Sequence, residues 1–354
     1  MLILTGSPII GRFDFKARVD FVRIPGVIKL HNGDYTSLGL HIDLADTLEL
    51  RESIIHHTAR VFRPDVFLVD KEPGGLQGEV TSTLQYFKGT KTQCVLGLRD
   101  VMDAPELLEK EWQKKQVLPI LESLYDELWV YGPQAMGDPL DGLAIKQQVK
   151  DKTRYTGYLR RQLPESTENI HLPQKPYILV TPGGGGDGVE MIDWVMRAYE
   201  HSPQPMSALF VLGPFMASAE RNQFLERAEA LEQVEVITFS QHLEHLMVNA
   251  YAVVAMGGYN TFCEILSFDR PTLVLPRSKP RQEQIIRARK AAELGLLSML
   301  DLESQRSTES MVEALEKLVT QEKPSSQALQ KLLGGLDFVT DRFGELIDAQ
   351  LGHG

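Results

Sequence analysis

Residues 253–289 constrain the fold of this chain more than any other stretch. They contain two short apolar runs, 253–256 and 272–275, each followed by a turn and then by residues with helical spacing. The first run stops at Gly257-Gly258, and Phe262 and Ile265 then lie on one helical face. Units that alternate strand and helix in this way predict a parallel sheet covered by helices.

The turn at Gly257-Gly258 is a candidate site for an anion. Asn260 and Thr261 are residue types that cap helix N-termini, and the glycines before them let a ligand approach the free N–H groups there. Glu264 follows within the same predicted helix, where its carboxylate can accept hydrogen bonds from sugar hydroxyls beside a bound phosphate. Taken alone, the glycines can be an ordinary turn and Glu264 a solvated helix residue.

A second glycine-rich turn follows the apolar run 177–180. Its backbone N–H groups are free to bind a diphosphate, and it matches neither the GxGxxG fingerprint nor the P-loop. The alternative is a flexible turn, and a carboxylate at Asp187 would repel a diphosphate unless it points away. The candidate phosphate-binding residues in this turn are Gly183, Gly184, Gly185 and Gly186.

The order Gly-Gly-x-x-Thr-x-x-Glu, then a strand ending in proline, then Glu283-Gln284 before a helix, resembles the donor-binding domain of the family 28 glycosyltransferases, the MurG-like superfamily. The resemblance implies that Glu264 holds the ribose of a UDP-sugar and that Glu283-Gln284 hold the donor sugar. It also implies that the nucleotide base packs on Phe239 and Ser240. The alternative for Phe239 is that it is the last core residue of its strand.

The first half of the chain also resembles predicted glycosyltransferases of this superfamily. The matching segments are TGSP at 5–8, RPDVFLVDKEP at 63–73, LGLRD at 96–100 and YTGYL at 155–159. In such proteins a strand, a glycine-rich loop bearing a histidine and a helix come earlier. The N-terminal domain is therefore expected to be incomplete at its start, through truncation, a misplaced start or a piece supplied by another polypeptide.

The expected architecture is α/β, with two Rossmann-like, doubly wound parallel-sheet domains that face a cleft, as in the GT-B fold. The boundaries are 1–159 for the acceptor-side domain, 160–175 for a linker poor in apolar residues, and 176–335 for the nucleotide-sugar domain. Residues 336–354 are expected to form a helix that can pack back on the first domain. A helix over 105–125 is expected to kink at Pro119.

The expected activity is inverting, metal-independent transfer of a hexose or N-acetylhexosamine from a nucleotide diphosphate sugar, without a cofactor. No Asp-x-Asp motif is evident, and His242 and His245 do not have the His-Glu-x-x-His pattern of a zinc motif. Asp100 and Glu72 are the candidates for the general base, although Asp100 can instead pair with Arg99 or cap a helix. The alternatives are a non-catalytic nucleotide-sugar-binding subunit that needs a partner chain, or a nucleotide-sugar hydrolase or epimerase.

Composition narrows the partners. With a net charge of −11, the chain is not expected to bind nucleic acid or a strongly anionic membrane. The sequence does not identify the acceptor, which can be lipid-linked or a glycan. A lipid-linked acceptor would bring the protein into peripheral contact with a membrane. Two cysteines and no apolar run of spanning length predict a cytoplasmic protein. A homo-oligomer or a partner chain can cover the incomplete sheet.

Overall fold

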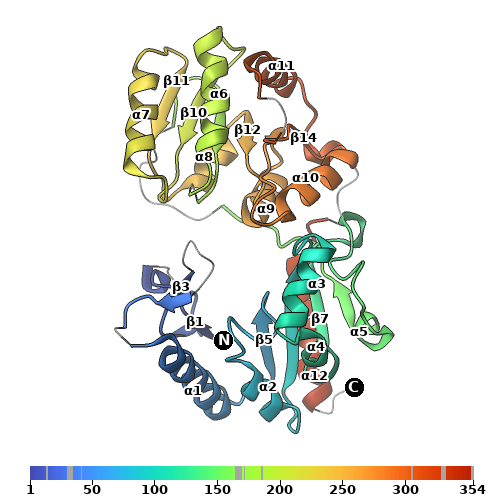
Figure 1. Cartoon of the computed structure of the whole chain (residues 1–354). Helices are drawn as coiled ribbons and strands as arrows, with labels where there is room; N and C mark the ends of the chain where they lie inside the picture. Colours follow the sequence, from blue (N-terminus) through green and yellow to red (C-terminus); the bar gives the residue numbers. More distant parts are fainter. Residues whose placement is uncertain are drawn as a thin grey trace.

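The computed structural model describes residues 1–12, 15–29, 35–40, 42–163, 170, 172–184, 186–303, 306–327 and 332–351. The described residues form two α/β domains, each built on a parallel sheet, which lie one above the other in Figure 1. This arrangement confirms the expected fold class.

The second domain contains a six-stranded parallel sheet in the order β11-β10-β9-β12-β13-β14. The central strand β9 places Ile178 and Val180 on one face, against α6 and α11, and Tyr177 and Leu179 on the other face, against α8 and α9. Both faces are therefore covered, as a doubly wound sheet requires. The strands are β9 (Tyr177–Thr181), β10 (Ser207–Val211), β11 (Val234–Ile237), β12 (Ala252–Ala255), β13 (Thr272–Val274) and β14 (Ser298–Met299). The helices are α6 (Val189–His201), α7 (Ser218–Glu229), α8 (Leu243–Asn249), α9 (Tyr259–Phe268), α10 (Glu283–Glu293), α11 (Thr308–Leu318) and the 3-10 turn η3 (Pro324–Ser326).

The first domain contains a four-stranded parallel sheet in the order β5-β6-β7-β8. In β7, Leu128 and Val130 join the core under the domain's own helices, whereas Trp129 and Tyr131 belong to the core on the opposite face. The strands are β5 (Val66–Asp70), β6 (Gln93–Arg99), β7 (Glu127–Tyr131) and β8 (Thr153–Tyr155). The helices are α1 (Leu44–Phe62), α2 (Thr81–Phe87), α3 (Pro105–Lys114), α4 (Val117–Ser123), α5 (Gln147–Asp151) and the 3-10 turn η2 (Gln134–Met136).

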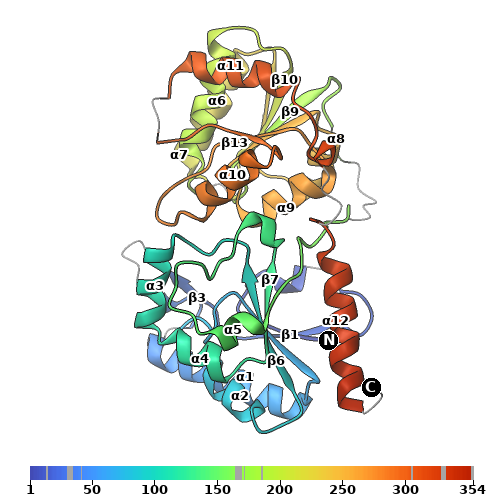
Figure 2. The same cartoon turned by 90° about the vertical axis from the view of Figure 1, so that its right-hand side faces the viewer.

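The last helix, α12 (Gly335–Leu351), belongs to the first domain in space, and Figure 2 shows it beside that domain. The Phe343 ring lies 5.2 Å from the Trp129 ring, centroid to centroid, and Arg342 forms an ion pair with Glu127. The chain thus crosses between the domains a second time. The two crossings are hydrogen-bonded to each other, since the Tyr158 N–H donates to the Leu332 carbonyl over 2.6 Å.

The N-terminal segment forms small sheets of its own. Strand β1 (Leu2–Thr5) pairs in parallel only with β2 (Asp20–Arg23), and β3 (Val27–Lys29) pairs with β4 (Tyr35–Ser37), after the 3-10 turn η1 (Ile10–Arg12). Strand β5 stands at the edge of the four-stranded sheet. Among the described residues, therefore, β1 and β5 each have one unpaired edge.

The expected helix over 105–125 is interrupted, but the kink predicted at Pro119 is wrong. The chain breaks at Gln116, whose φ of 51° is left-handed, and a new helix, α4, begins at Val117. Pro119 lies in the first turn of α4, where its missing N–H has no helical partner to lose. No helix in the described part of the chain is both long and apolar enough to cross a membrane.

Candidate active site

Three loops of the second domain meet beyond the carboxyl ends of β9, β12 and β13. Strand β9 lies between β10 and β12, so the strand order reverses at this point, where open α/β sheets bind ligands. A Cβ atom on Gly183 would lie 3.4 Å from Oγ1 of Thr261. The glycine-rich turn after β9 therefore lies against the first turn of the helix that follows Gly257-Gly258.

The first of these turns leads directly into α9. The helix begins at Tyr259 with Gly258 as its N-cap, so the expectation that Asn260 and Thr261 cap it is wrong. Gly257 adopts a φ of +75°, and a Cβ there would lie 2.8 Å from Val274. Only glycine fits this bend. The bend turns the chain into α9 at Tyr259, so Asn260 already lies inside the helix. No side chain caps the helix, so its first N–H groups remain available to an anion.

The second turn leads into α6, whose N-cap Gly188 also makes no side-chain capping bond. Gly185 lies outside the described residues. Asp187 forms an ion pair with Arg277 over 2.7 Å. This cation offsets the charge that would otherwise repel a diphosphate from the loop, and it links the loop to the segment after β13.

Arg277 also positions the polar pair at the start of α10. Its Nη2 lies 3.1 Å from Oε1 of Glu283, and its backbone N–H donates to Oε1 of Gln284 over 3.2 Å. Two buried atoms of this group, Oε2 of Glu283 and Nε of Arg277, have no hydrogen-bond partner in the described part of the chain. An acceptor and a donor are therefore free for the hydroxyl groups of a ligand.

Glu264 is half-buried on α9 and forms no hydrogen bond or ion pair with another described residue. Burial, reinforced by the charge of Glu244 and opposed by Arg161, raises the pKa of Glu264 to about 7. A desolvated carboxylate without a donor is the group expected to gain most from hydroxyl donors on a ligand.

Two aromatic side chains of the second domain, Phe239 and Phe215, are exposed. Phe239 is 51% exposed, so the interpretation of Phe239 as a core residue is wrong. Phe239 and Ser240 line a cavity of about 190 Å³ that also touches Leu209 and Ile237. Phe215, which the sequence analysis did not single out, is 76% exposed and packs beside Gly184 and Gly186.

Asp100 is not available as a general base. Its side chain is 1% exposed and binds the Arg287 guanidinium through both oxygens, over 2.7 and 2.8 Å, while the Tyr158 hydroxyl donates to it over 2.6 Å. The partner is Arg287 of the second domain, and not Arg99 as the sequence analysis considered. Arg287 also donates to the Gly257 carbonyl over 3.3 Å, so this buried pair joins the first domain to the glycine turn before α9.

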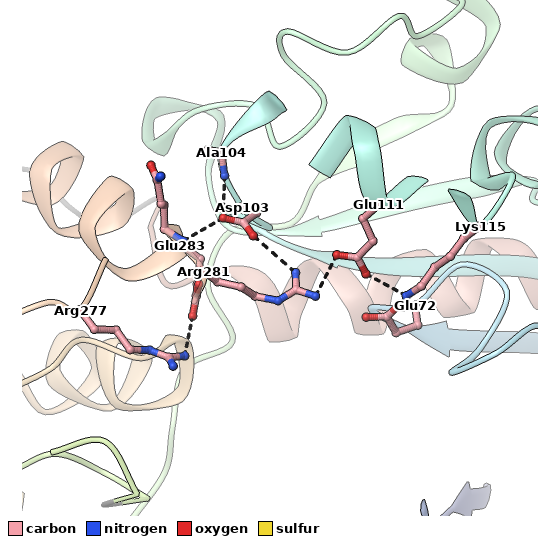
Figure 3. Close-up of polar contacts among 9 residues, drawn as sticks. Glu72, Asp103, Ala104, Glu111, Lys115, Arg277, Arg281 and Glu283 are labelled. Carbon is pink, nitrogen blue, oxygen red and sulfur yellow. Dashed lines mark hydrogen bonds and ion pairs between the residues drawn. The ribbon is translucent and has the colours of Figure 1, made fainter. Parts of the chain in front are cut away.

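Glu72 belongs to a chain of ion pairs that runs from one domain to the other (Figure 3). Its carboxylate lies 2.8 Å from Nζ of Lys115, which also contacts Glu111, and Glu111 contacts Arg281 of the second domain over 3.0 Å. The Glu72 side chain is 27% exposed, whereas the Asp100 side chain is 1% exposed. Within the described residues, no group of three or more His, Cys, Asp or Glu side chains could hold a metal ion.

Two parallel-sheet domains that face each other, with the strand order of the second domain reversing at this site, are the arrangement of the GT-B fold. MurG of Acinetobacter baumannii has this fold and superposes with a TM-score of 0.54, and it is 10% identical over 89% of this chain and 80% of that one.

Two relatives in sequence agree with this class. An uncharacterized glycosyltransferase of Methanosarcina acetivorans is 24% identical over 89% of this chain and 81% of that protein. The UDP-N-acetylglucosamine--N-acetylmuramyl-(pentapeptide) pyrophosphoryl-undecaprenol N-acetylglucosamine transferase of Geobacillus kaustophilus is 27% identical over 50% of this chain and 46% of that protein. Residues 201–334 match the glycosyltransferase family 28 C-terminal domain. The domain match and the two relatives indicate a glycosyltransferase that is similar to the MurG-like enzymes of family 28.

Proposed function

We propose that this glycosyltransferase moves a hexose or N-acetylhexosamine from a UDP-sugar to an acceptor hydroxyl by inverting displacement, without a metal ion or cofactor. The observation that carries the proposal is that Gly183 of one glycine turn lies beside Thr261, in the first turn of the helix that follows the other, and that neither α6 nor α9 has a side-chain cap. A diphosphate bound there would meet the positive ends of α6 and α9 together. The Geobacillus relative is named for a UDP-sugar donor, which supports UDP as the nucleotide.

The remaining donor contacts follow from the free polar atoms of the site. In this proposal Glu264 accepts from the ribose hydroxyls, Oε2 of Glu283 accepts from a sugar hydroxyl, and Phe239 with Ser240 packs on the base. Negative charge develops on the diphosphate as the sugar leaves. A well-placed donor for such charge contributes about 3 to 4 kcal/mol in studied enzymes, so helix N-termini can supply much of the catalysis.

Glu72 is the remaining candidate for the general base, because Asp100 is enclosed by Arg287 and Tyr158. Lys115 holds the Glu72 carboxylate near the carboxyl end of β5, on the side of the first domain that faces the second. The Geobacillus relative acts on a pyrophosphoryl-undecaprenol acceptor, which supports a lipid-linked acceptor here. Both cysteines are free and buried, which supports a reducing, cytoplasmic setting.

Gly184→Val tests the donor site. A Cβ at Gly184 would meet only Phe215, at 3.6 Å, so the protein itself tolerates a side chain there. We expect the variant to lose at least about tenfold in affinity for UDP and little for uridine, because the added bulk blocks the approach of phosphates to the backbone. Calorimetry with both ligands in the presence of EDTA measures this. Equal losses for both ligands, or binding that needs added Mg²⁺, would contradict the proposal.

The alternative of a binding subunit that needs a partner rests on the unpaired edges of β1 and β5. Leu68 of β5 is 37% exposed, and five more large apolar side chains near the small sheets are exposed: Ile9, Ile28, Leu38, Leu40 and Ile42. We expect the isolated chain to self-associate or to bind a partner chain over this region. Sedimentation analysis, with UDP binding and sugar transfer measured on the same sample, tests this. A monomer with full transfer activity would remove the need for a partner.

A further inference from the structure

Lys71 is a residue that the proposed donor site does not use. It directly follows β5 and adopts a left-handed backbone with a φ of 68°. Its N–H donates to the Gly97 carbonyl over 2.7 Å, and the next N–H, of Glu72, donates to the Asp70 carbonyl over 2.8 Å. This conformation is uncommon for residues other than glycine and persists only where the surroundings impose it. The fold therefore fixes where the Lys71 side chain leaves the strand.

The Lys71 amine is half-buried and forms no hydrogen bond or ion pair with another described residue. Four charged groups face it: Arg99 and Glu72 from the first domain, and Arg281 and Glu283 from the second. Burial first, and then Arg281 and Arg99, lower the pKa of Lys71, although Glu72 and Glu283 oppose the change. The positive charge of Lys71 is thus not fully balanced by the nearby carboxylates.

The two carboxylates near Lys71 are already engaged with other cations. Glu72 pairs with Lys115 over 2.8 Å, and Oε1 of Glu283 pairs with Arg277 over 3.1 Å. Neither lies within ion-pair distance of the Lys71 amine. The Lys71 ammonium group of the first domain therefore lies near Glu283, the residue proposed to contact the donor sugar. The partner that Lys71 lacks is an anion.

We propose that Lys71 is a phosphate-binding residue contributed by the first domain, so that the substrate phosphates are held from both domains. The inference rests on the proposed function. The phosphate can come from the diphosphate of the donor or from a phosphate on the acceptor. Either anion would restore the charge balance around the amine, and either would bring Lys71 next to the reacting groups.

The experiment compares Lys71→Met with Lys71→Arg and with Lys110→Met, an exposed lysine on α3 that serves as the matched control. Calorimetry is carried out with UDP, with uridine, and with inorganic phosphate added to the UDP complex. A donor-phosphate role predicts that Lys71→Met loses at least about tenfold in UDP affinity and little in uridine affinity. An acceptor-phosphate role predicts unchanged UDP affinity and loss of phosphate binding to the UDP complex. Lys71→Arg should retain part of either affinity.

Proton uptake separates this role from a structural one. An anion favours the ammonium form, so binding raises the lowered pKa of Lys71 and takes up protons at alkaline pH. Titrations at about pH 9 in buffers of different ionisation enthalpy should show this uptake in the wild type and not in Lys71→Met. If Lys71→Met matches the wild type in all three titrations while Gly184→Val loses UDP affinity, the inference fails and the proposed function stands. If the wild type binds no UDP, the proposed function fails.

Discussion

Asp100→Ala is expected to lower the free energy of unfolding by about 3 to 5 kcal/mol, the usual cost of leaving one member of a buried ion pair without its partner. Asp100 and Arg287 are each 1% exposed, and the Tyr158 hydroxyl loses its acceptor as well. Denaturant unfolding followed by circular dichroism measures the change. Because the pair joins the two domains, the variant is also expected to unfold in separated transitions.

Arg289→Met is the matched control, because Arg289 lies on the same helix, is 60% exposed and pairs with Asp301 over 3.5 Å. An exposed pair of this kind contributes about 1 kcal/mol or less. The double variant Asp100→Leu with Arg287→Met should recover part of the lost stability, since it leaves no uncompensated charge. A loss below about 1 kcal/mol for Asp100→Ala would show that the pair does not hold the domains together.

Glu264→Ala is expected to weaken UDP binding by about 1.5 to 3 kcal/mol, the range for hydrogen bonds to a charged group. Calorimetry on the wild type, Glu264→Ala and Glu264→Gln measures this. Glu264 forms no hydrogen bond or ion pair with another described residue, so its removal should change stability little. Unchanged UDP affinity in Glu264→Ala would remove this residue from the site.

The same residue gives the site a pH dependence. Ribose hydroxyls donate to the ionised carboxylate, so UDP affinity should rise by up to about tenfold between pH 6 and pH 8, and Glu264→Gln should lack that part of the rise. For folding, the pKa of about 7 lies above the unfolded value. Protonated Glu264 therefore stabilises the folded state. This stabilisation is fully present below about pH 4 and is lost as the pH rises through about 7.

Local patterns predicted the second domain well. The glycine turn, the helix that follows it, β13 and α10 depend on neighbouring residues, so the apolar spacing and the glycines were sufficient to place them. Helix α1 (Leu44–Phe62) ends at Arg63 in a left-handed conformation, directly before Pro64. The start of α9 was misplaced because the close approach of Gly257 to Val274 is a tertiary constraint.

The polar contacts of the site could not be predicted from the sequence. Asp100 and Arg287 are separated by 187 positions, and no local pattern pairs them. Arg277 resembles any loop arginine until the fold places it between Asp187 and Glu283. Phe215 follows a strand as many core residues do, and only its exposure beside the glycine loop marks it.

The second crossing of the chain has a mechanical consequence. Two backbone segments join the domains, and they are hydrogen-bonded to each other at Tyr158. The Tyr158 N–H donates to the Leu332 carbonyl, and the Gly335 N–H donates to the Tyr158 carbonyl. A single flexible connection would allow the domains to twist and swing about several axes. A connection of two paired segments resists twisting, so it favours bending about one axis that passes through the paired segments. Bending of this kind would change the separation of Lys71 in the first domain and Glu283 in the second, the two residues proposed to contact the substrates.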